Sequence, residues 1–264
     1  MGIIEENLRY DGGMINIFHT VGCLGDSLAS GEFEYDNNGE TGYWDAYDYS
    51  WGKVIERLTG ISVTNYSYGG LTAWQMYKDA TEQNGPNADI NRLFCPEDRK
   101  QAYIIALGAN DLNGVGNLEK MYGGIVGTSE DICMEDWRKN ADSFVGVYAK
   151  IIQRLKENQP DARFFLVAMP NDKPENIKSL EVCNAIASVL DKCYVLDFFH
   201  EAPNYDAEFQ KKYFMGGHMN PMGYVMTAYY IMTYIDYIIM QNPKEFQDVA
   251  FMGTTMKFKD TTKS

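Results

Sequence analysis

Short apolar runs alternate with longer helical patterns along most of the chain. Five runs rich in β-branched, aromatic and other apolar residues predict strands, at residues 15–24, 61–65, 102–107, 163–168 and 194–196. The segments between them predict helices, at residues 51–58, 71–80, 136–158 and 177–190. This alternation predicts a parallel sheet with right-handed crossovers and helices on both faces, which is a three-layer α/β/α sandwich.

Two segments do not fit this alternation. Residues 31–50 combine six aromatic with six acidic residues, and residues 109–135 are rich in glycine. Both follow the carboxyl ends of predicted strands or the turn after one, so we expect them to form substrate walls or lids. Because no linker or repeat is visible, we expect a single domain over residues 1–264, with insertions near 31–50 and 109–135.

Composition narrows the classes of partner. The net charge is −14 and no Lys/Arg cluster interrupts it, which argues against nucleic acid and anionic membranes as partners. The five cysteines are odd in number and lack metal-ligand spacing, so we expect reduced thiols, no metal and no cofactor. Residues 222–240 approach the length of a membrane span, but Thr227, Thr233 and Asp236 favour a buried core helix. Residues 1–10 contain no apolar signal segment, so the expected location is cytoplasmic, with a secreted mature form as the alternative.

The candidate nucleophile follows the first predicted strand, in Gly25-Asp26-Ser27-Leu28. A serine on a sharp turn from a strand into a helix exposes its hydroxyl at the carboxyl edge of the sheet, where open α/β folds bind ligands. A serine hydroxyl attacks an ester only when a neighbouring base takes its proton. We therefore predict that Ser27 is a nucleophile.

Three further segments follow in order along the chain: Asn65-Tyr-Ser-Tyr-Gly-Gly70-Leu-Thr72, Gly108-Ala109-Asn110-Asp111 and Gly217-His218-Met219-Asn220-Pro221. Together the four segments resemble the blocks of the SGNH, or GDSL, hydrolase family of esterases and acylhydrolases. The resemblance extends from about residue 16 to 241. It implies a five-stranded parallel sheet in flavodoxin-like order and hydrolysis of esters through an acyl-enzyme.

The resemblance also implies roles for individual residues. His218 would be the base that takes the Ser27 proton, and Asn220-Pro221 would begin the last helix and fix its position. The oxyanion hole would combine the backbone N–H groups of Ser27 and Gly70 with the side-chain amide of Asn110. Gly69 is the alternative to Gly70.

One position departs from the family pattern. The family usually has an acid three residues before the histidine, and Met215 stands there. The candidates for orienting His218 are a backbone carbonyl near Met215, Asp197 after the fifth predicted strand, and Asp206 in the following loop. The sequence leaves this choice open.

The predicted substrate is a short-chain acyl ester, with an acetyl ester of a carbohydrate as the first choice, so the partner would be a small molecule or an oligosaccharide. Tyr43, Trp44 and Tyr47 would form a wall, because aromatic faces stack on sugar rings while carboxylates accept hydrogen bonds from hydroxyls. The alternatives are a short-chain carboxylesterase, a lysophospholipase or thioesterase and, in another class, an inactive carbohydrate-binding protein on the same fold.

Overall fold

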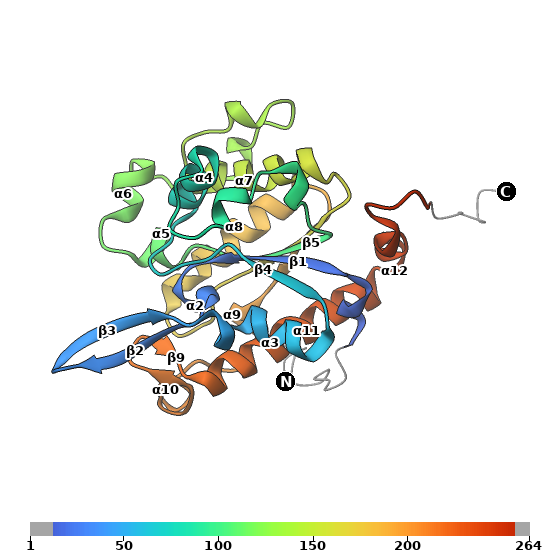
Figure 1. Ribbon diagram of the computed structural model, residues 1–264. Coiled ribbons are helices and arrows are strands. Elements are labelled where there is room, and N and C mark those ends of the chain that lie inside the picture. Colours follow the sequence, from blue (N-terminus) through green and yellow to red (C-terminus); the bar gives the residue numbers. More distant parts are fainter. Residues whose placement is uncertain (1–12, 257–264) are drawn as a thin grey trace.

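Five parallel strands form the central sheet in the computed structural model, which describes residues 13–256 (Figure 1). The sheet has the order β4-β1-β5-β6-β7, so its second strand along the chain lies outside the first. This is the predicted flavodoxin-like order, and the α/β fold class is confirmed. The strands are β1 (Thr20–Gly25), β4 (Ser62–Asn65), β5 (Ala102–Ala106), β6 (Arg163–Val167) and β7 (Cys193–Leu196).

Helices cover both faces of this sheet (Figure 1). One apolar core joins the sheet to α3 (Trp51–Thr59) and α11 (Pro221–Gln241). A second core joins the other face to α4 (Ala73–Glu82), α7 (Phe144–Asn158) and α8 (Ile177–Ala187). The three layers therefore follow from strands that are apolar on both faces.

Two predicted elements begin later than expected. Met14–Ile17 forms a 3-10 helix, η1, and β1 starts only at Thr20, because the Asp236 carboxylate accepts a hydrogen bond from the Ile15 N–H at 2.8 Å and fixes the entering chain. The helix predicted at 136–158 contains a short 3-10 helix, η6 (Trp137–Lys139), and α7 begins at Phe144. Ser143 caps α7 by accepting from the Gly146 N–H at 3.1 Å, which sets its true start.

The two unusual segments fold into small elements beside the carboxyl ends of the strands. Residues 31–50 form an antiparallel hairpin, β2 (Glu32–Asn37) and β3 (Glu40–Asp45), which projects from the body in Figure 1, followed by η2 (Tyr47–Tyr49). Residues 109–135 contain α5 (Ala109–Asn113), α6 (Asn117–Tyr122) and η5 (Ser129–Asp131).

The remaining short elements connect these parts. They are α2 (Ser27–Ser30), η3 (Ile90–Arg92), η4 (Pro96–Asp98), η7 (Pro174–Asn176), α9 (Phe198–Glu201), α10 (Ala207–Tyr213), β8 (Phe214–Met215), β9 (His218–Met219), α12 (Pro243–Phe246) and η8 (Val249–Phe251).

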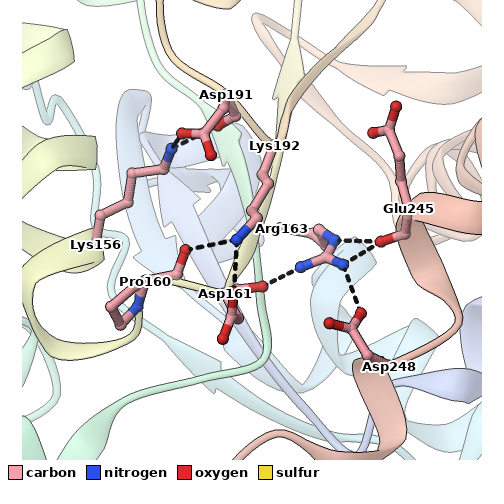
Figure 2. Close-up of polar contacts among 8 residues, drawn as sticks. All are labelled: Lys156, Pro160, Asp161, Arg163, Asp191, Lys192, Glu245 and Asp248. Carbon is pink, nitrogen blue, oxygen red and sulfur yellow. Dashed lines mark hydrogen bonds and ion pairs between the residues drawn. The ribbon is translucent and has the colours of Figure 1, made fainter. Parts of the chain in front are cut away.

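A polar network closes the amino-terminal edge of the sheet (Figure 2). The buried Arg163 guanidinium donates to the backbone carbonyls of Asp161 and Glu245 and pairs with the Asp248 carboxylate at 2.9 Å. Nearby, Lys192 pairs with Asp161 at 2.6 Å. Arg163 thereby fastens the segment around α12 to β6.

Helix α11 is the apolar stretch that approached the length of a membrane span. Thr227, Thr233 and Asp236 are buried within the protein, as expected of a core helix. In the part of the chain that the structure covers, no helix combines the length and apolarity needed to cross a bilayer. The expectation about residues 1–10 lies outside the described residues.

Candidate active site

Ser27 is the first residue of α2, directly after β1. Asp26 caps this helix, because its carboxylate accepts a hydrogen bond from the Leu28 N–H at 3.1 Å. Burial raises the pKa of Asp26 to about 7, although that hydrogen bond opposes the shift. Gly25 is required for the turn, since a Cβ there would lie 2.5 Å from that of Ala29. The sequence thus folds into a tight turn that carries the serine at its end.

His218 begins β9, which packs against α2 and against the hairpin strand β2. Behind it, Asn220 caps α11 by accepting from the Gly223 N–H at 2.9 Å, and Pro221 is the first helical residue. This is the helix start expected of an Asn-Pro pair. It fixes the backbone two residues after the imidazole.

The acid that orients His218 is Glu34, a residue the sequence analysis did not select. Its Oε1 lies 2.7 Å from Nδ1 of His218 and also accepts from the Gly217 N–H at 2.8 Å. The close approach depends on glycine, because a Cβ at Gly216, whose φ is +71°, would fall 1.9 Å from Glu34 Oε2. The Glu34 carboxylate, from β2, therefore takes the place of the family's acid, whose position in the sequence is occupied by Met215.

The three predicted orienting groups are corrected accordingly. Asp197 caps α9 and lies 2.9 Å from Nδ1 of a different histidine, His200. Asp206 caps α10 by accepting from the Phe209 N–H. Met215 pairs with His218 across the β8-β9 turn, but the Glu34 carboxylate occupies Nδ1. Both aspartates are engaged at helix starts, which removes them as partners.

A second carboxylate lies at the other ring nitrogen. Glu32 Oε1 is 3.1 Å from Nε2 of His218, and both side chains are largely buried. Burial raises the pKa of Glu32; the nearby His218 opposes that shift, while Asp45 and Glu34 add to it. Asp45 accepts hydrogen bonds from the Ser30 hydroxyl and from the Gly69 N–H, the latter at 3.2 Å. The hairpin thus contacts both the histidine and the loop after β4.

Three N–H donors are available for an oxyanion. Within residues 13–256, the backbone N–H groups of Ser27 and Gly70 make no recorded hydrogen bond, whereas that of Gly69 is taken by Asp45. Gly70 has a φ of +76°, which favours glycine, and a Cβ there would meet open space. One amide hydrogen of Asn110 binds the Leu71 carbonyl at 3.1 Å, which leaves the other for a ligand. These contacts favour Gly70 over Gly69.

Asp111 anchors the loops behind Asn110. Its buried Oδ1 accepts from the Ala73 N–H at 2.9 Å and from the Tyr122 hydroxyl, while Oδ2 has no partner in the described structure. Burial raises its pKa to about 6, against the opposing effect of these hydrogen bonds. Asp111 therefore ties the start of α4 to α6 around the candidate oxyanion hole.

The hairpin has two different faces, because side chains alternate along a strand. Tyr43 is paired with Glu34 and lies with its ring centroid 5.9 Å from that of His218, at 77°. Trp44 is paired with Phe33 on the opposite face. Tyr47 lies outside the hairpin and donates to the Val63 carbonyl at 3.4 Å. Of the three predicted wall residues, only Tyr43 lies beside His218.

A cavity of about 320 Å³ lies beside the residues that flank the candidate nucleophile. It is lined by the neighbours of Ser27 (Asp26 and Leu28), by Asn110, and by apolar side chains that include Met169, Phe214, Met219 and Ile231. The sequence analysis did not foresee it, because its walls come from several separate segments. It supplies room for part of a ligand next to the proposed oxyanion hole.

No cluster of three or more His, Cys, Asp or Glu side chains suited to a metal ion occurs within residues 13–256. All five cysteines are free thiols. The serine hydroxyl, the imidazole and the surrounding carboxylates lie at this edge of the sheet.

One signal for the missed acids was present in the sequence. Glu32-Phe33-Glu34-Tyr35 alternates carboxylates with aromatic residues, which is the pattern of a strand with one polar and one apolar face. The pattern could have predicted that both carboxylates share a face. It could not have shown that the face meets His218, which is 184 residues away along the chain.

Comparisons with known proteins bear on the family and the fold. The family model for the GDSL-like Lipase/Acylhydrolase family matches residues 23–226. No curated protein matches the chain.

Several solved structures share the fold at low sequence identity. A family two carbohydrate esterase from Clostridium thermocellum, in complex with cellohexaose, has a TM-score of 0.54 and 16% identity, covering 86% of this chain and 65% of that one. A protein from Lactobacillus plantarum has a TM-score of 0.54 and 16% identity, covering 83% and 97%. A carbohydrate esterase family 2 enzyme from Corynascus thermopiles (Myceliophthora fergusii) has a TM-score of 0.53 and 14% identity, covering 84% and 67%. Since the matched residues span more than half of its length, the chain belongs to the GDSL-like lipase/acylhydrolase family.

Proposed function

We propose that this protein hydrolyses short-chain acyl esters, with Ser27 as nucleophile, His218 as base and Glu34 as the acid that orients the base. The observation that carries the proposal is the meeting of three features at one sheet edge. They are a serine at a strand-to-helix turn, unpaired N–H donors beside it, and a histidine held at Nδ1 by a carboxylate 2.7 Å away.

These groups suffice for an acyl-enzyme mechanism. The Ser27 oxygen attacks the ester carbon while Nε2 of His218 takes the hydroxyl proton. The N–H groups of Ser27 and Gly70 and the Asn110 amide stabilise the oxyanion. His218 then returns its proton to the leaving alcohol, and water releases the acyl group by the same steps. Throughout, Glu34 keeps the proton of Nδ1 in place and stabilises the imidazolium.

Replacement of the nucleophile tests this proposal directly. Ser27→Ala should abolish hydrolysis of p-nitrophenyl acetate, with a loss of about 10⁴-fold or more. The fold should remain, because loss of one partly buried hydroxyl removes little packing. An organophosphonate should label Ser27 and no other serine, as read by peptide mass spectrometry. Undiminished turnover, or labelling of a different serine, would overturn the assignment and favour a binding protein on this fold.

For the alcohol part of the substrate we favour a carbohydrate. Tyr43 lies beside His218, and carboxylates on the same hairpin face could accept hydrogen bonds from sugar hydroxyls. Two structures that share the fold are described as carbohydrate esterases. Incubation with mixed acetylated oligosaccharides should produce mass losses of one acetyl group per step. The proposed substrate is thus a small-molecule or oligosaccharide ester, and the chemistry described needs no cofactor.

The cavity favours a second candidate, an esterase, lysophospholipase or thioesterase for longer acyl chains. Its volume of about 320 Å³ exceeds what an acetyl group fills, and many of its lining side chains are apolar. A p-nitrophenyl ester series from acetate to octanoate separates the candidates by kcat/KM. For a short-chain acyl esterase we expect the rate to fall as the chain grows. A maximum at six to eight carbons, given about 0.8 kcal/mol for each buried CH₂, would favour the second candidate.

A further inference from the structure

The His218 ring is held between two carboxylates of a single strand. Glu32 and Glu34 are two residues apart in β2, so both point to the same face of the hairpin. Glu34 Oε1 lies 2.7 Å from Nδ1, and Glu32 Oε1 lies 3.1 Å from Nε2. A neutral imidazole carries one N–H, whereas an imidazolium carries two. Two carboxylates at the two nitrogens therefore favour the ring that carries both protons.

The proposed reaction needs the opposite state at Nε2. To accept the Ser27 proton, Nε2 must present a lone pair. In the described structure Ser27 makes no recorded hydrogen bond to His218, although α2 and β9 pack together, and the group found at Nε2 is Glu32. The carboxylate and the nucleophile thus compete for one nitrogen.

We propose that Glu32 gates the catalytic nitrogen of His218: its carboxylate holds a proton on Nε2 in the resting site, and ester attack begins only once that proton has left. The inference rests on the proposed function. The released proton goes to solvent, which leaves Nε2 with its lone pair and Nδ1–H bound to Glu34. During attack the Ser27 proton moves to Nε2, and the imidazolium so formed again faces Glu32. The same carboxylate therefore opposes the start of the reaction and stabilises the charge that develops later.

The groups around Glu32 strengthen its hold on the proton. Asp45 of β3 and Glu34 of β2 add negative charge beside Glu32. Burial raises the pKa of the Asp26 cap of α2 to about 7, so its charge joins theirs only as the pH passes that value. From α11, the Tyr224 hydroxyl donates to the Glu32 backbone carbonyl at 2.7 Å and not to the carboxylate that lies at Nε2 of His218.

The loop after β4 completes these surroundings. Gly69 lies against the carboxylate, since a Cβ at that residue would fall 2.0 Å from Oε2. Among the ion pairs of residues 13–256, none joins these acids to a lysine or arginine. Within the same part of the chain, His218 is the basic side chain that pairs with Glu32 and Glu34.

Glu32→Gln tests the gate, because it removes the charge and keeps the side-chain volume. We expect the acidic limb of the pH profile of kcat/KM to move down by about one pH unit, the usual effect of one close opposite charge. We also expect the plateau at high pH to fall, because the imidazolium loses a partner. The two profiles should therefore cross. A profile lowered by the same factor at every pH would overturn the gate and leave Glu32 with a purely structural or substrate-binding role.

Proton NMR supplies a readout that does not depend on turnover. The chain has three histidines, so their Cε1–H signals can be followed separately. The signal that disappears in His218→Gln is the one that belongs to His218. In Glu32→Gln the titration midpoint of the His218 signal should fall by about one unit. An unmoved midpoint would refute the gate even if the esterase assignment holds. A moved midpoint in a protein without esterase activity would refute only the proposed function.

Two variants serve as controls. Glu40→Gln removes the same charge from the exposed part of the hairpin, where Glu40 pairs with Asn37 at the turn, and should leave both profile and midpoint unchanged. Glu32→Asp keeps the charge but withdraws the carboxylate, so it should shift both readouts in the same direction as Glu32→Gln, by less. This variant keeps the test decisive if Glu32→Gln fails to fold. Equal shifts in Glu40→Gln would show a general charge effect and overturn the proposal.

Discussion

Charged side chains are arranged differently at the two ends of the central sheet. At the amino-terminal edge three cations each pair with an anion: Arg163 with Asp248, Lys192 with Asp161, and Lys156 with Asp191 (Figure 2). Burial alone would raise the pKa of Asp191, but the hydrogen bond and charge of Lys156, with Lys192, lower it. Asp191 is thereby held in the charged form that its ion pair with Lys156 needs.

At the carboxyl-terminal edge, like charges gather around one imidazole. The pKa of Asp26 is raised to about 7 and that of Asp111 to about 6, in both cases mainly by burial, and the pKa of Glu32 is raised as well. Such shifted acids destabilise the folded state near neutral pH and cluster at functional sites. Opposite charges are thus paired at one edge, where they stabilise the fold. At the other edge, where the proposed chemistry occurs, several acids lie close together around one histidine.

The largest effect that we predict comes from Glu34. Glu34→Gln should lower kcat by about 10³- to 10⁴-fold, because an amide no longer enforces the imidazole tautomer or stabilises its charge. The measurement is kcat for p-nitrophenyl acetate at saturation, with folding checked by thermal melting. Asp197→Asn and Asp206→Asn serve as controls and should keep most of the activity, because these carboxylates cap α9 and α10. A large loss in either control, with Glu34→Gln active, would move the acid elsewhere.

Substitutions at the amino-terminal edge should change the stability of the fold and leave the catalytic rate unchanged. Arg163→Met should lower the free energy of unfolding by about 3 kcal/mol, because the Asp161 and Glu245 carbonyls and the Asp248 carboxylate lose a buried donor. Urea denaturation measures this loss, and kcat well below the melting temperature should be unchanged.

A matched variant separates the buried pair from the exposed one. Lys192→Met breaks an ion pair with Asp161 whose side chains are 28% and 57% exposed, so its effect should stay under about 1 kcal/mol. If both variants cost the same, burial of the guanidinium is not what stabilises this edge. If Arg163→Met lowered kcat in the folded state, the separation between the two edges would fail.

The sequence predicts the sheet and the local parts of the site for a physical reason. Some features depend only on residues near one another in the chain, so the sequence predicts them. They are the apolar runs, the Gly25 turn and the Asn220-Pro221 helix start. The contact between Glu34 and His218 depends on how a hairpin folds back over a turn 184 residues later. No local sequence pattern encodes how the hairpin packs on the His218 turn. The prediction that Asp197, Asp206 or a carbonyl near Met215 orients His218 was therefore wrong.

The wall residues show the same limit. Tyr43 and Trp44 are adjacent in sequence, and strand alternation sends them to opposite faces. The pattern gives the alternation, but only the packing of the hairpin decides which face meets His218. The cavity is also a property of packing, since its lining includes residues from the turn after β1, from β5, β6 and α11, and from several of the loops between them.

The smallest predicted effect concerns the pH dependence of stability. Asp26 has a pKa near 7 in the folded state against an ordinary value of 3.8, so its stabilising contribution is complete below about pH 4 and is lost as the pH rises through 7. Asp26→Asn keeps a capping side chain and cannot ionise. The melting temperature of this variant minus that of the unmodified chain should therefore increase between pH 4 and 8, because the unmodified chain alone acquires a buried charge. Arg163→Met, measured in parallel, should show no such rise, since Arg163 begins β6 at the opposite edge of the sheet from Asp26 and the substitution leaves Asp26 unchanged. A constant difference for Asp26→Asn would mean that Asp26 ionises normally and that the conflict of charge at this edge is confined to the hairpin acids around His218.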